Sequence, residues 1–173
     1  MAQRRISVYV ALVSMFSALT AALTYLVRVL SPTDGYTHIG DTIIRDTIIY
    51  LAALLFGPSV GVAVGILGPL AADLLAGYPR WYVSIVAHGV QGYLAGLGRG
   101  RRFRAQAMLL VAAGLAMSFT YFAVNVYIKG VALATASLIR DVFGQSLVSW
   151  ILSLLLVKPL EKNPVVQKAA SMV

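Results

Sequence analysis

Apolar runs long enough to cross a lipid bilayer recur along most of this chain, and they limit the possible folds more than any other feature. The first run covers residues 6–30 and directly follows Arg4 and Arg5. A transmembrane helix needs about 20 predominantly apolar residues, whereas the core of a signal peptide has about 7–15. We therefore interpret residues 6–30 as a membrane span that the chain retains.

Composition excludes the soluble alternatives. Of the 173 residues, 60% are apolar and 12% are charged, against about 45–50% and about 25% in an average soluble domain. A disordered segment carries far less apolar surface than this. The chain has no cysteine, and its two histidines lie far apart, so we predict no disulfide framework, no metal site and no resident cofactor. The fold class that remains is an all-α membrane protein.

The breaks between apolar runs predict a single integral membrane domain over residues 1–173, folded as a compact bundle of six transmembrane helices. Their approximate ranges are 6–30, 42–56, 60–76, 81–97, 105–128 and 140–157. Gly57-Pro58 marks one break and Gly77 with Pro79 another, because proline has no N–H to donate and glycine tolerates tight turns. Residues 129–141 form a mildly polar connector that has room for a short interfacial helix.

The distribution of charge orients the bundle, since short cytoplasmic loops carry an excess of Lys and Arg. If both termini are cytoplasmic, nine of the 14 basic residues fall inside: Arg4, Arg5, Arg99, Arg101, Arg102, Arg104, Lys158, Lys162 and Lys168. The five on the outer side are Arg28, Arg45, Arg80, Lys129 and Arg140. Of the six acids, only Glu161 falls inside. We therefore predict an N-in, C-in topology in the cell membrane, and we attribute the net charge of +8 to topology rather than to nucleic-acid binding.

Polar residues follow one face of the fourth predicted span and one face of the fifth. At intervals of three and four, these are Trp81, Ser84, His88 and Gln91 in the fourth span and Ser118, Tyr121 and Asn125 in the fifth. Gln145 and Asp73 lie at a similar depth in other spans. Because polar groups at membrane depth face the bundle interior or a water-filled cavity, these residues predict a polar cavity that opens to the outside.

Structural roles compete with ligand binding at several of these positions. Asp41 and Arg45 are four residues apart in the favourable helical order, so an ion pair and a ligand contact both stay open, and Asp46 follows directly. Asp73, near a helix end, is interpreted first as a residue that orders the next loop. Aromatic residues such as Trp81 are also typical of the membrane interface.

Small residues recur at every fourth position of the first span, at Ser14, Ala18 and Ala22. Small residues let two membrane helices approach closely. Two interpretations stay open: packing within the bundle, or a groove where another membrane helix docks.

Motifs for catalysis and nucleotide hydrolysis are missing from the sequence. It has no Gly-x-x-x-x-Gly-Lys-Ser/Thr loop, so active transport needs an ATPase partner, and it has no Gly-x-Ser-x-Gly elbow or His-Glu-x-x-His pair. Two alternatives to a binding subunit stay open. One is a small intramembrane enzyme that uses His88 as a base, with Ser84 or Ser118 as nucleophile. The other is a structural membrane subunit without a ligand.

Three stretches between residues 35 and 96 carry a family resemblance. They read GYTHIGDTII, LAALLFGPSVGVAVGILGPLAADLLAGYPRW and HGVQGYLAG. Together with six predicted spans and a basic inner loop at 99–104, they make the chain resemble the substrate-binding (S) components of energy-coupling factor (ECF) vitamin transporters. The branch is that of riboflavin and hydroxymethylpyrimidine or thiamine-type transporters.

The resemblance implies that the chain captures one water-soluble vitamin in an outward-facing pocket, which the loop between the first two spans caps. Carried over to this sequence, the pocket residues are Tyr36 and His38 in the cap and Trp81, Ser84, His88, Gln91, Tyr121, Asn125, Arg140, Asp141 and Gln145 on the walls. The family's docking motif of small residues maps onto Ala18 and Ala22, with Ser14 one turn earlier. The implied partners are a transmembrane coupling subunit and paired ATPases, which drive uptake.

Overall fold

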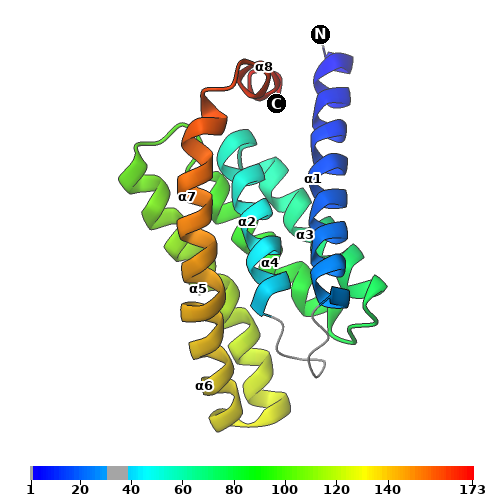
Figure 1. Ribbon diagram of the computed structural model, residues 1–173, viewed down its shortest axis with the longest axis vertical. Helices are drawn as coiled ribbons and strands as arrows, with labels where there is room; N and C mark the ends of the chain where they lie inside the picture. Colours follow the sequence, from blue (N-terminus) through cyan, green and yellow to red (C-terminus); the bar gives the residue numbers. More distant parts are fainter. Residues whose placement is uncertain (1, 31–38) are drawn as a thin grey trace.

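The computed structural model describes residues 2–30 and 39–173, and all the regular secondary structure in these residues is helical (Figure 1). Along the chain the elements are α1 (Ala2–Leu30), α2 (Ile39–Phe56), α3 (Pro58–Leu75), α4 (Trp81–Gly96), α5 (Phe103–Lys129), α6 (Val131–Ile139), the π-helical segment η1 (Arg140–Ser146), α7 (Leu147–Glu161) and α8 (Pro164–Ala170). The predicted all-α fold class is confirmed.

Successive long helices run in opposite directions, so the helical bundle has two distinct ends (Figure 1). We call the end that holds both termini the terminal end, and the end that holds the α3–α4 and α5–α6 turns the distal end. At the terminal end Arg99 donates hydrogen bonds to the main-chain oxygens of Phe56 (2.9 Å) and Val173 (3.2 Å). A further bond to the Ala170 oxygen joins Arg99 to α8.

Within the described residues, four stretches are long and apolar enough to cross a membrane. They are Gln3–Leu30, Pro58–Leu75, Phe103–Lys129 and Val131–Glu161. α4 is shorter, with 16 residues, and α2 carries Asp41, Arg45 and Asp46. Four such stretches support a multi-pass membrane protein.

α2 lies inside the bundle, where it packs against α1, α3, α4 and α7. Its second half forms the apolar core, in which Ile49 and Tyr50 are fully buried. Its first half carries buried charged residues. Because protein surrounds α2, the helix tolerates charges that a lipid-facing helix excludes.

The last helical stretch begins earlier than predicted. The predicted connector at 129–141, which had room for a short helix, is helical over most of its length: the chain turns at Gly130, where φ is +80°, and α6 covers Val131–Ile139. The hydroxyls of Thr135 and Ser137 donate to main-chain oxygens four residues earlier, at 2.9 and 3.0 Å. The helix itself therefore satisfies the polar groups that made this stretch look like a connector.

The small-residue stripe on α1 faces outward. Ser14, Ala18 and Ala22 are all exposed, whereas Ser17 and Thr20 lie on the buried face of the same helix. Packing within this chain therefore does not explain the stripe, and the docking groove stays a prediction.

α3 and α4 approach each other through their backbones at Gly61 and Gly92. A methyl group added at either glycine would clash with the main-chain oxygen of the other. We expect Gly92→Ala to lower the free energy of unfolding by about 1–3 kcal/mol, the usual cost of overpacking. Thermal unfolding of the purified protein in detergent measures this effect.

Gly89→Ala on the same helix is the matched control. Its added methyl meets only the flexible side chain of Ile66, at 3.2 Å, and alanine favours a helix over glycine by about 1 kcal/mol. We expect this variant to melt at or above the temperature of the unmodified protein. Equal melting temperatures for Gly92→Ala and Gly89→Ala would contradict the close backbone contact.

Candidate functional site

A cavity lies toward the distal end of the bundle. The described residues that line it are Arg28, Asp41, Thr42, Arg45, Asp73, Tyr78, Arg80, His88, Tyr121, Asn125, Lys129, Arg140, Asp141 and Gln145. They come from α1, α2, α3, α4, α5, η1 and the α3–α4 turn. The side chains of nearly the whole bundle therefore meet at one polar site.

Most of the wall residues that the resemblance implied lie at this cavity. His88, Tyr121, Asn125, Arg140, Asp141 and Gln145 line it directly. Ser84 and Gln91 are buried behind the lining and hydrogen-bond to it. The two cap positions, Tyr36 and His38, lie outside the described residues.

Trp81 is the exception among the expected wall residues. Its side chain is 40% exposed and contacts the ring of Tyr82 edge-on, at 6.0 Å between ring centroids. Trp81 does not line the cavity. Its position at the first residue of α4 suits the membrane interface, which was the alternative interpretation of this aromatic residue.

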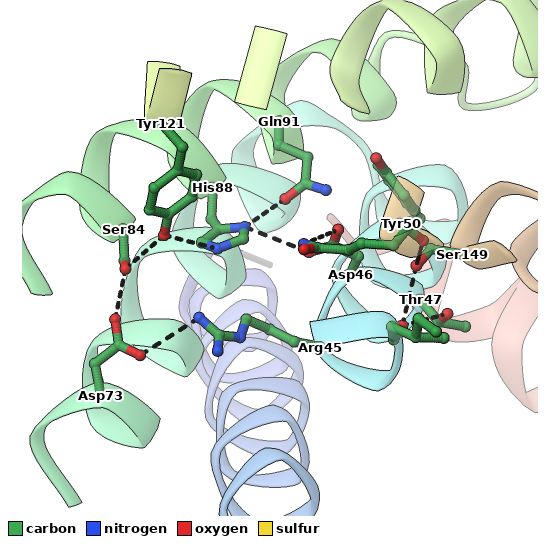
Figure 2. A network of polar contacts seen from close by, with 12 residues as sticks. Arg45, Asp46, Thr47, Tyr50, Asp73, Ser84, His88, Gln91, Tyr121 and Ser149 are labelled. Carbon is green, nitrogen blue, oxygen red and sulfur yellow. Dashed lines mark hydrogen bonds and ion pairs between the residues drawn. The ribbon is translucent and has the colours of Figure 1, made fainter. Parts of the chain in front are cut away.

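A chain of polar contacts connects four helices behind the cavity (Figure 2). Ser84 donates to Asp73 at 2.5 Å and contacts the Tyr121 hydroxyl at 2.7 Å. The same hydroxyl lies 3.4 Å from His88 Nε2. On the other side of the ring, His88 Nδ1 lies 2.6 Å from Gln91 Oε1 and 3.5 Å from Asp46 Oδ1.

The available protons decide which atom donates and which accepts in each hydrogen bond of this chain of polar contacts. A carboxylate accepts only, so Ser84 donates to Asp73 and must then accept from Tyr121. With Nδ1–H donating to Gln91, a neutral His88 has no proton on Nε2 for Tyr121. The Tyr121–His88 contact is therefore weak, in agreement with its 3.4 Å length. A ligand that donates to Nε2 would complete the chain.

This geometry gives the enzyme alternative no support. A serine nucleophile needs a hydrogen bond to its base, but the Ser84 hydroxyl bonds to Asp73 and Tyr121 instead. The Ser118 hydroxyl has no hydrogen-bond partner among the described residues. Neither of the proposed nucleophiles is bonded to His88.

Arg45 joins α2 to α3. Its Nη1 lies 3.4 Å from Asp73 Oδ1, and both side chains are almost fully buried. Asp41 and Asp46 also attract the Arg45 guanidinium. The attraction between Asp41 and Arg45 within α2, one of the two alternatives for these residues, is thus only part of a larger cluster that extends across two helices.

Asp73 has two roles, one of which the sequence predicted. Its main-chain oxygen accepts from the Tyr78 amide at 2.8 Å and so orders the loop after α3. Its side chain instead turns inward, to Arg45 and Ser84. Asp73 thus contributes its main chain to the loop after α3 and its side chain to the polar contacts.

The π-helical segment η1 supplies a further part of the cavity wall. Gln145 Nε2 donates to Asp46 Oδ2 at 2.8 Å, and Arg140 donates to Asp141 at 2.6 and 2.9 Å. A π-helix has a wider turn than an α-helix and occurs frequently at functional sites. Its turn presents all three of these side chains to the cavity.

Sequence reasoning did not assign Arg28, Thr42, Tyr78, Arg80 and Lys129 to the site, although they line the cavity. A signal for three of them was present. All five basic residues that the charge rule predicts on the outer side line this one cavity: Arg28, Arg45, Arg80, Lys129 and Arg140. The sequence analysis used them only to orient the bundle.

The fold and the site define a class: a multi-pass helical membrane protein with a charged polar cavity inside the bundle. The family model described as "ECF-type riboflavin transporter, S component" matches residues 6–162. The chain belongs to this family of S components, as the resemblance indicated. S components are transporter subunits, and membership implies partner subunits of an ECF transporter.

Two curated relatives have names that state no function. An "Uncharacterized protein in gap 3'region" from Pyrococcus woesei is 33% identical over 123 residues, which cover 69% of this chain and 79% of that protein. A "UPF0397 protein" from Streptococcus pneumoniae (strain Hungary19A-6) is 43% identical over 49 residues. That shorter match covers 28% of this chain and 27% of the streptococcal protein.

Proposed function

We propose that the chain is the substrate-capture subunit of an ECF-type transporter. It binds a water-soluble vitamin or precursor, of the riboflavin or thiamine/hydroxymethylpyrimidine type, in an outward-facing pocket. Partner subunits that hydrolyse ATP then drive uptake. One observation carries the proposal: His88, Tyr121, Asn125 and Gln145 line a single cavity although they come from three separate elements.

The proposal includes the topology. The single membrane domain over 1–173 crosses the membrane six times, with both termini cytoplasmic and the distal end outside. Support comes from the alternating helix directions (Figure 1) and from the basic residues that the charge rule assigns to the terminal end. α2 and α4 are spans in this arrangement, and burial within the bundle reduces the hydropathy that they need.

The recognition chemistry follows from the cavity walls. Tyr121 and His88 meet edge to face, 5.9 Å between centroids, and offer aromatic surface to a planar heterocycle. Asn125 and Gln145 offer amides to its polar edge. The cavity has a volume of about 100 Å³, whereas pockets for drug-sized ligands measure about 300–1,000 Å³. Side chains must therefore move apart when a ring-containing ligand enters.

The coupling partner docks on the exposed stripe of Ser14, Ala18 and Ala22. A surface of small residues on a membrane helix lets a second helix approach closely. The stripe is exposed on α1 and none of its three residues lines the cavity. Docking and ligand capture thus use separate residues, which makes them separable by mutation.

Ligand titration tests the capture role. We expect the protein, purified in detergent, to bind one member of a panel of riboflavin, thiamine, hydroxymethylpyrimidine and their phosphates with submicromolar affinity. His88→Ala and Asn125→Ala should each weaken that binding by about 1–3 kcal/mol, because each leaves a buried polar partner unpaired. Calorimetry measures the affinities, and a flavin carried through purification would show as a yellow absorbance band.

Ser118→Ala is the matched control on the face of α5 that carries Asn125. The Ser118 hydroxyl is buried and has no partner among the described residues, so its loss should leave ligand affinity unchanged. A structural subunit without a ligand would bind no member of the panel. Full affinity in both His88→Ala and Asn125→Ala would contradict this pocket while leaving capture elsewhere in the chain intact.

A further inference from the structure

The His88 ring has a defined donor side and a defined acceptor side. Its Nδ1 lies 2.6 Å from Gln91 Oε1 and 3.5 Å from Asp46 Oδ1 (Figure 2). The ring is 1% exposed, and burial favours the neutral form, which carries a single proton. Because amide and carboxylate oxygens can only accept, that proton belongs on Nδ1. His88 Nε2 is therefore a hydrogen-bond acceptor.

Among the described residues, none donates a proton to His88 Nε2. The Tyr121 hydroxyl lies 3.4 Å away, but its proton goes to Ser84, because the Ser84 proton goes to Asp73. A buried acceptor that is left without a donor is unfavourable. His88 and Tyr121 both line the cavity, so a ligand there can supply the missing donor.

Two amide side chains of the cavity wall are each bonded at one end. Gln145 Nε2 donates to Asp46 Oδ2 at 2.8 Å, and Asn125 Oδ1 accepts from Arg80 at 3.1 Å. A carboxylate only accepts and a guanidinium only donates, so these bonds fix the orientation of both amides. The other ends, Gln145 Oε1 and Asn125 Nδ2, bond to no described residue. The wall thus adds one acceptor and one donor to His88 Nε2.

The contacts of these three groups hold them close together. His88 and Gln145 approach the two oxygens of the same Asp46 carboxylate. Asn125 lies one helical turn after Tyr121 on α5, and the Tyr121 ring meets the His88 ring edge-on, at 5.9 Å between centroids. One small ligand therefore reaches all three groups.

We propose that the ligand is a planar heterocycle with an amino group beside a ring nitrogen or a carbonyl group. The amino N–H groups donate to His88 Nε2 and Gln145 Oε1, and the neighbouring nitrogen or oxygen accepts from Asn125 Nδ2. Gln91 is a positioning residue, because it holds the proton on His88 Nδ1 and so keeps Nε2 an acceptor. The proposal rests on the capture function above and narrows its substrate class. A cyclic imide has one donor between two acceptors and matches these groups less well.

Nitrogen-15 NMR of the histidine rings tests the first step without any ligand. A ring nitrogen with a proton and one without a proton resonate in separate regions of the spectrum. The chain has two histidines, so His38→Gln assigns the signals of histidine-labelled protein in detergent. We expect a proton on His88 Nδ1 and none on Nε2. A proton on Nε2 in the protein without ligand, whether the ring is neutral or charged, overturns the inference.

Matched ligands that differ in one group test the substrate class. The probes are hydroxymethylpyrimidine with its amino group against the same compound with an oxo group in that place, and thiamine against oxythiamine, with riboflavin as the imide. We expect the amino member of at least one pair to bind at least about tenfold more tightly than its oxo analogue and than riboflavin. A site built to receive an N–H group strongly rejects an analogue that lacks it. Calorimetry in detergent measures the affinities.

Gln91→Met tests the positioning role, because it removes the oxygen that accepts from His88 Nδ1. We expect the affinity for the preferred amino compound to fall by about tenfold, its preference over the oxo analogue to narrow, and the NMR signals to show the proton shared between both ring nitrogens. Gln106→Met is the matched control. Gln106 is also fully buried in a helix, but it donates to Glu161 at 2.9 Å and does not line the cavity.

The control variant should change neither the affinities nor the His88 signals, and melting temperatures without ligand verify that both variants fold. An unchanged His88 spectrum and unchanged affinity in Gln91→Met overturn the positioning role. Tight binding of riboflavin or an oxo analogue, with the amino compounds no better, overturns the amino heterocycle and leaves capture standing. No binding by any of these probes or by the vitamin panel contradicts the capture function itself.

Discussion

Replacing Asp73 with asparagine is expected to lower the free energy of unfolding by about 3 kcal/mol. The change leaves the Arg45 guanidinium, which is 5% exposed, without the carboxylate 3.4 Å away. Removing one partner of a buried ion pair costs about 3–5 kcal/mol, because the other charge stays buried and uncompensated. Asp41 and Asp46 also attract Arg45, which places the expected loss at the lower end of that range. Chemical unfolding in detergent without ligand measures it.

Two further variants separate the charge from the shape of Asp73. Combining Asp73→Asn with Arg45→Met removes both charges of this pair. Asp41 and Asp46 then lose the cation that attracts them, so we expect only part of the lost stability to return. Asp141→Asn breaks a pair whose arginine is 31% exposed, so water can solvate the remaining charge and the loss should be below about 1 kcal/mol. Equal losses for Asp73→Asn and Asp141→Asn would contradict the buried pair.

The helices were predictable because their signals are local. Apolar runs and the breaks at Gly57 and Gly77 depend only on neighbouring residues, and the structure places α2, α3 and α4 on either side of these breaks. For the same reason, the stretch 131–139 was predicted only as a connector with room for a short helix. Its serine and threonine hydroxyls look polar in sequence, yet they bond back to their own helix.

Residue spacing predicted the site only where a single helix presents it, and depth along the spans added Gln145 and Asp73. The stripes of α4 and α5 gave His88, Tyr121 and Asn125 because their spacing puts them on one face, and all three line the cavity. Contacts between side chains of different helices leave no such spacing pattern in the sequence. Arg45 has Asp41 four residues away, but its contact at 3.4 Å is with Asp73 on α3. The spacing of residues within one helix does not show which neighbouring helix comes close.

Trp81 shows that residue spacing can mispredict a cavity residue even within one helix. It continues the spacing of Ser84 and His88, yet it stands at the first residue of α4 and is 40% exposed. At the end of a helix, side chains on the cavity face leave the bundle and reach the interface. Arg80 is the opposite case: it lies outside the stripe, before α4 begins, but it lines the cavity because its side chain turns back toward Asn125.

The second large effect is expected on docking to the coupling subunit. Ala18→Trp should abolish co-purification of this chain with the transmembrane coupling subunit while its ligand affinity stays unchanged. Small residues on α1 let a partner helix approach to backbone distance, and an indole ring at this position prevents that approach. Ala18 is exposed and does not line the cavity, so ligand capture is not affected. Co-expression with the coupling module, followed by affinity purification from detergent, measures the association.

Leu19→Trp is the matched control, because it places the same indole next to Ala18 but on a different face of α1. Leu19 is 44% exposed and already large, so a partner that docks on the small stripe does not approach closely there. We expect full co-purification for Leu19→Trp and none for Ala18→Trp or Ala22→Trp. Association that survives in the alanine variants, or is lost equally in all three, would show that the partner uses another surface. The stripe would then need a different explanation, since packing within this chain does not provide one.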